Sequence, residues 1–173
     1  MAMRIIIGAV ARAVSSMVTV LGILAAACGG DPYERYAAAV RDDVDGASRE
    51  AFQMTARLQL TVVQNQIPDD SMTVAASTVT RAARDVRKHA VHFARVVAPA
   101  DLAEAHAGLN AALTRVADAL DSLGAVFQQC ATRSPCQAHL DSVSNQFQFV
   151  GEDLHNGRQF VQRLLLRHGV MLR

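Results

Sequence analysis

Histidine and carboxylate side chains are the residues of this 173-residue chain whose types and spacing suit chemistry. His89, His106 and His155 fall on or beside apolar stripes with helical spacing. Antiparallel pairing across short turns brings them to one half of a bundle. The same half receives a cluster of four acids: Asp42, Asp43, Asp45 and Glu50. Imidazole and carboxylate together suit Zn, Cu, Ni or Fe, so one interpretation is a metal site at the three histidines.

We favour an interpretation of the histidines that involves no bound metal. Only His106 falls on a strict core position, and His92 is expected to face water. Residues 152–155 match the Glu-x-x-His element of di-iron bundles, but those bundles need a second copy and two further glutamates. A buried, hydrogen-bonded His106 with solvated neighbours and no bound metal is therefore the simpler expectation.

Catalytic motifs are missing from the sequence. It has no glycine-rich nucleotide loop, no G-x-S-x-G, no H-E-x-x-H and no haem-attaching C-x-x-C-H. We therefore expect a protein that is not an enzyme.

A basic stripe is the second feature of interest. Arg81, Arg84, Lys88 and Arg95 recur at helical spacing. One interpretation is a site for an anionic polymer, a lipid head group or a partner protein. The interpretation that we favour is ion pairing with the acids at the same level, where exposed pairs contribute about 0–1 kcal/mol each.

The first 28 residues are organised unlike the rest. Arg4 and Arg12 are their only charges, and three alanines lead to Cys28. Residues 13–24 form an apolar run apart from Ser15, Ser16 and Thr19. A basic start, a short apolar run and small residues at the end are the parts of a secretory signal peptide. The alternative is a membrane-spanning anchor, which needs about 20 consecutive apolar residues. The run is shorter than that, so we expect a signal peptide.

The end of this segment, Leu24-Ala25-Ala26-Ala27-Cys28, resembles the lipobox of bacterial lipoproteins. The family prefers Leu three residues before the cysteine, where this chain has Ala25. The resemblance implies that Cys28 carries acyl chains and becomes the first residue of a membrane-anchored protein. In this family Asp directly after the cysteine often keeps the protein in the inner membrane. Gly29 follows here, which implies the periplasmic face of the outer membrane where the host has one.

Composition restricts the rest of the chain. The formal net charge is +1, with 51% hydrophobic and 19% charged residues. Removal of the leader takes away two arginines, so the mature chain stays near neutral. A nucleic-acid binder would carry a basic excess, and a disordered chain would be less hydrophobic.

We expect a signal peptide at 1–27, a lipidated tether at 28–32 and one helical domain at 33–173. The membrane and an envelope protein are the expected partners.

Four segments have helical periodicity, at residues 33–66, 70–97, 100–131 and 135–168. In the second segment the apolar residues alternate by four and three: Met72, Ala76, Val79, Ala83, Val86, Ala90, Phe93 and Val97. The third repeats this alternation from Leu102 to Cys130, and the fourth is expected to bury Leu140, Val143, Phe147, Val150, Leu154, Val161 and Leu164. Short connections force neighbouring helices antiparallel. The predicted fold is an all-α, up-down-up-down four-helix bundle; dimerising hairpins or an extended coiled coil remain alternatives.

Two cysteines remain beside Cys28. Cys130 and Cys136 flank the turn between the third and fourth segments, and in an oxidising compartment we expect a disulfide. Free thiols or a redox pair are the alternatives, although the spacing differs from the C-x-x-C of redox motifs.

The C-terminal residues 170–172 lie beyond Gly169. They are expected either to rest on a membrane or partner or, as we favour, to fray or close the core.

Two functions therefore remain open. One is a lipid-anchored, non-enzymatic binding or scaffold module, and the other is a metal- or small-ligand-binding bundle. A large exposed apolar groove would favour the first, and a bound metal at clustered histidines would favour the second.

Overall fold

The computed structural model describes residues 30–63, 69–132 and 137–172. All its regular elements are helical: α2 (Pro32–Ala39), η1 (Val40–Asp45), α3 (Gly46–Val63), α4 (Asp69–Phe93), η2 (Ala100–Leu102), α5 (Ala103–Cys130) and α6 (Gln137–Leu166). Elements α2, η1 and α3 follow one another without a break, and we call this run the first helix. Residues Tyr33–Arg173 make one compact unit with its own buried core. We therefore expect this unit to fold without the leader.

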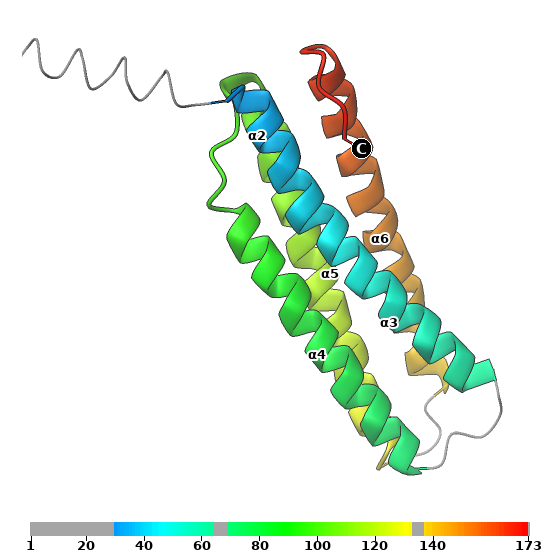
Figure 1. The fold of residues 1–173 in the computed structure, drawn as a ribbon. Helices are drawn as coiled ribbons and strands as arrows, with labels where there is room; N and C mark the ends of the chain where they lie inside the picture. The colour runs from blue at the N-terminus through cyan, green and yellow to red at the C-terminus, as the bar shows by residue number, and fades with distance from the viewer. Residues whose placement is uncertain (1–29, 64–68, 133–136, 173) are drawn as a thin grey trace, which may run out of the picture. The chain divides into compact units, whose positions relative to one another are not determined.

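The first helix, α4, α5 and α6 pack antiparallel (Figure 1), which confirms the predicted four-helix bundle. Helix α5 packs closely against both α4 and α6, and α3 packs against α4. Helices α3 and α6 approach each other much less. No helix in the described part of the chain is long and apolar enough to cross a membrane.

The core follows the expected stripes on α4 and α5. Buried side chains of α5 include Leu109, Leu113, Val116, Leu120 and Phe127. Small residues let the helices approach closely. At Gly124 an added Cβ would lie 2.8 Å from Oγ1 of Thr80 on α4.

A π-helical turn interrupts the first helix at Val40–Asp45. A π-turn accommodates one extra residue in an α-helix. Here that extra residue allows Asp43 and Val44, which are neighbours in sequence, both to be buried. The sequence does hold a signal for it, because buried Tyr36, Val40 and Val44 are spaced by four and four instead of four and three.

Helix α4 ends at Phe93, four residues before the predicted end. Val97, which the heptad pattern placed on the core stripe, is 90% exposed, so that prediction was wrong. Pro99 disfavours helical geometry in the residue before it, and the chain must leave the helix in time to reach α5. Val97 therefore lies beyond the end of the helix, where heptad spacing does not predict burial.

Helix α6 is buried unevenly along its length. Leu154, Val161 and Leu165 are buried, whereas Leu140, Val143, Phe147, Val150 and the predicted core residue Leu164 are only partly buried against the core. The sequence predicted one continuous core stripe, and that was wrong for the first half of α6. The physical reason is that α3 does not close over this half.

The C-terminal tail closes the core at the other end of α6. Gly169 has φ 76°, a left-handed conformation that glycine adopts without strain. The Val170 N–H donates to the Leu165 carbonyl at 3.1 Å, and the Gly169 N–H donates to the Leu166 carbonyl. These bonds form the Schellman pattern that ends many helices. Val170 is buried, in agreement with the favoured expectation of core closure.

Candidate functional site: a groove between α3 and α6

A cavity of about 710 Å³ lies between α3 and α6. Its apolar lining comes from three helices: Ala51 and Phe52 of α3, Val116 of α5, and Phe147 and Leu154 of α6. Phe52 is 73% exposed, so a large apolar side chain stands at the groove with little to cover it. Pockets of roughly 300–1,000 Å³ with an apolar lining and a few polar groups are typical of ligand sites.

The residues that face the groove explain why it is open. Ser48 and Thr55 line it from α3, and their hydroxyls donate to carbonyls of their own helix, at Val44 and Ala51. Gly151 lines it from α6, and a Cβ added there would meet nothing within 4 Å. Short side chains turned back on their own helix leave a gap that neither helix fills.

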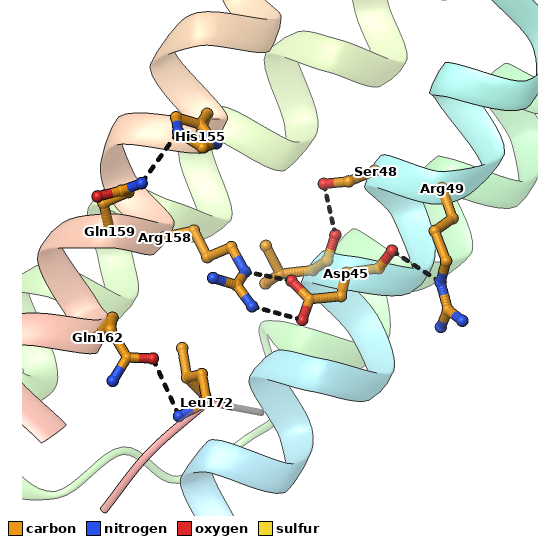
Figure 2. Close-up of polar contacts among 9 residues, drawn as sticks. Asp45, Ser48, Arg49, His155, Arg158, Gln159, Gln162 and Leu172 are labelled. Carbon is orange, nitrogen blue, oxygen red and sulfur yellow. Dashed lines mark hydrogen bonds and ion pairs between the residues drawn. The ribbon is translucent and has the colours of Figure 1, made fainter. Parts of the chain in front are cut away.

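An ion pair spans one end of the groove. Arg158 of α6 reaches across to Asp45 of the first helix (Figure 2), and its Nε and Nη2 donate to the two carboxylate oxygens, Nη2 at 2.8 Å. Both side chains are about three-quarters buried. These hydrogen bonds raise the pKa of the Arg158 guanidinium above its ordinary value, so the arginine stays charged. A two-point pair of this kind fixes geometry as well as adding energy.

The C-terminal tail occupies the region beyond this ion pair. Figure 2 shows Leu172 beside Gln162 on one side of the pair and His155 on the other. The Leu172 N–H donates to Oε1 of Gln162 at 2.9 Å, and Val170 packs in the core. The Arg158–Asp45 pair therefore separates a region that the chain's own tail fills from the groove.

The three histidines predicted as metal ligands have different surroundings. His155 lines the groove and pairs with Gln159 at 3.1 Å. His89 pairs with Asp43 at 3.2 Å, and His106 lies among aromatic rings. No group of three or more His, Cys, Asp or Glu side chains suited to a metal occurs among the described residues. A metal site at these histidines stays a prediction that the geometry does not favour.

The buried carboxylate of Asp43 instead joins two histidines of α4. Its carboxylate accepts one hydrogen bond from Nδ1 of His89 at 3.2 Å and one from Nδ1 of His92 at 2.7 Å. The π-turn directs Asp43 toward α4, and Gly46 makes room for the His89 ring, because a Cβ there would lie 3.0 Å from it. The sequence placed these residues at one level but did not predict that His92 would pair with a buried acid.

His106 was predicted to be buried and hydrogen-bonded; it is only partly buried, and the expected hydrogen bond is missing. Its ring lies 4.5 Å from that of Phe93 and 5.8 Å from that of Tyr36. Its Nδ1 and the Tyr36 hydroxyl have no protein hydrogen-bond partner. Burial lowers the pKa of His106, so the neutral ring is favoured.

The predicted basic stripe lies along α4 and the turn after it. Lys88 pairs with Asp85 of the same helix at 2.7 Å, and hydrogen bonding from Lys88 lowers the pKa of Asp85. Arg81, Arg84 and Arg95 are exposed. In the described part of the chain, none of these four pairs with the acids of the first helix, which was the arrangement that we favoured. The stripe as a partner site stays a prediction.

Cys28 and Cys136 lie outside the described residues, and Cys130 is the last residue of α5. The lipidation and the disulfide therefore stay predictions. Searches against protein-family models, curated proteins and solved structures found no match to this chain.

Proposed function

We propose that this protein is a lipid-anchored module of the bacterial cell envelope that binds an apolar ligand in the groove between α3 and α6. The groove is the observation that carries the proposal. It combines an apolar lining, a volume suited to a small ligand and an exposed Phe52. A groove of this kind is the feature that distinguishes a binding module from a metal-handling bundle.

The module is not an enzyme in this proposal. The described groove residues include one histidine, His155, which pairs with Gln159 and not with an acid or a nucleophile. Binding needs only apolar area and a few polar groups for orientation, and the groove supplies both.

Fluorescence of a neutral apolar probe, N-phenylnaphthylamine, tests ligand binding. We expect the probe to brighten on binding to the wild-type helical unit, and Phe52→Ser to weaken this binding because it removes a lining ring. Phe149→Ser is the matched control, since Phe149 is 71% exposed and lies outside the groove lining. Equal loss of binding in both variants, or no binding to wild type, contradicts the proposal.

The membrane anchor needs a separate experiment in the living cell. We expect the full chain to incorporate labelled palmitate, and we expect Cys28→Ala to abolish the label and release the protein from membranes. Globomycin, which blocks lipoprotein signal peptidase, should leave the longer precursor. Labelling that survives Cys28→Ala rules out this anchor.

A further inference from the structure

The charged side chains that line the apolar groove are Asp45, Arg49 and Arg158, so the lining carries one net positive charge. The Arg158 guanidinium carries five N–H groups, and Asp45 accepts two of them. Both oxygens of Asp45 are engaged by the same arginine. Three N–H groups of Arg158 therefore remain for another acceptor, at the point where the apolar lining ends.

His155 adds a second polar side chain at this end. It lies one turn before Arg158 on α6, and both residues line the groove. Its Nε2 lies 3.1 Å from the amide nitrogen of Gln159. Polar groups of two residues thus stand near one end of an apolar channel.

The ion pair also limits the width of the groove. At this end the two helices are held within the combined reach of one arginine and one aspartate side chain. A helix with its side chains is about 10–12 Å across, so a further helix does not fit between the first helix and α6 at this end. Beyond the pair, the extended tail at Val170 and Leu172 packs against the same end of α6. An extended chain is therefore the shape that suits the groove.

Building on the proposed function, we infer that the groove binds one long-chain carboxylate, with its head group on Arg158 and its chain along Phe52 and Phe147. Charge favours a carboxylate over a phosphate. Asp45 already balances much of the arginine's charge, so the site suits a single negative charge better than two. The arginine fork also matches the planar geometry of a carboxylate.

Displacement of N-phenylnaphthylamine from the helical unit tests this inference. The competitors are dodecanoate and dodecanol, which share a chain and differ in the head group, and dodecyl phosphate, a monoester whose head group carries about 1.5–2 negative charges at pH 7. We expect dodecanoate to compete about tenfold or more better than dodecanol, because hydrogen bonds to charged groups are the stronger kind. Equal competition by dodecanoate and dodecanol, or stronger competition by dodecyl phosphate than by dodecanoate, overturns the inference.

Variants of the ion pair locate the head group. Arg158→Met should lower dodecanoate affinity about tenfold, to the level of dodecanol, and leave dodecanol unchanged. Arg115→Met is the control, because Arg115 forms another interhelical pair, with Asp153 at 3.3 Å, outside the groove lining. Asp45→Asn provides a second test in case the Arg158→Met variant does not fold. The substitution removes the negative charge and one of the two acceptor oxygens, so at least one more N–H group of the arginine is freed and we expect dodecanoate to bind more tightly; unchanged or weaker binding contradicts the inference.

Failure of the inference and failure of the proposed function give different results. If the probe binds in a Phe52-dependent way and the head group makes no difference, the groove is a general apolar site and only the carboxylate assignment is wrong. If the probe does not bind to the wild type, both proposals are wrong.

Discussion

The buried carboxylate of Asp43 offers the sharpest test of the bundle's energetics. Its side chain is 5% exposed, and its two partners, His89 and His92, are 32% and 71% exposed. Replacing both histidines by alanine leaves a buried acid without its two hydrogen-bond donors. Leaving a buried polar group unsatisfied is costly, and more so for a charged one.

The size of the expected loss of stability follows from the two hydrogen bonds to Asp43. The 2.7 Å bond from His92 and the 3.2 Å bond from His89 each belong to the class that contributes about 1.5–3 kcal/mol. The exposure of His92 reduces its share, since water competes for its proton. We expect His89→Ala/His92→Ala to lower the free energy of unfolding by about 3 kcal/mol.

A third substitution tests whether the unpaired charge of Asp43 causes this loss of stability. Asp43→Leu in the same background removes the stranded charge, and the space left by the two imidazoles accommodates the larger side chain. Apolar residues often replace buried ionic groups without loss, so we expect the triple variant to regain most of the stability. Urea unfolding followed by far-ultraviolet circular dichroism measures the free energy of unfolding of the wild type, the double variant and the triple variant. A double variant within about 0.5 kcal/mol of wild type, or a triple variant no better than the double, refutes the reasoning.

Three further predictions concern other parts of the bundle. Because burial lowers the pKa of His106, the unfolded chain binds this proton more readily, so stability falls as the pH drops below about 6.5; His106→Leu should remove that part of the decline in urea titrations. Gly108→Ala meets nothing within 4 Å and should stabilise by about 0.5–1 kcal/mol in thermal melts, whereas the clash at Gly124 should offset the same gain there. Deletion of residues 170–173 should cost about 2 kcal/mol, because Val170 is buried; unchanged stability would mean that the tail does not close the core.

Helical periodicity was sufficient to predict the architecture, because four segments with three-and-four spacing and short connections leave few other arrangements. The same reasoning failed at Val97, since spacing alone does not say where a helix ends. It also missed the π-turn, although the four-and-four spacing of Tyr36, Val40 and Val44 was available as a signal.

The groove could not be predicted from the apolar stripes. Periodicity says which face of α6 is apolar, but not how far α3 stands from it. A partial signal was present in the small or polar residues beside both stripes, Ser48 and Thr55 on α3 and Gly151 on α6. The surroundings of the three histidines could not be predicted for a related reason. Turn arithmetic places His89, His106 and His155 at similar heights in the bundle, but it does not say which neighbour each ring faces.

Amide chemical-shift mapping by NMR with added dodecanoate is the measurement that tests the groove most directly. The account predicts shifts concentrated at Phe52, Phe147 and Leu154, with Arg158 changing at the end of the groove. Shifts centred on the exposed Phe149 and Phe160 of α6, or no localised shifts at all, would contradict it.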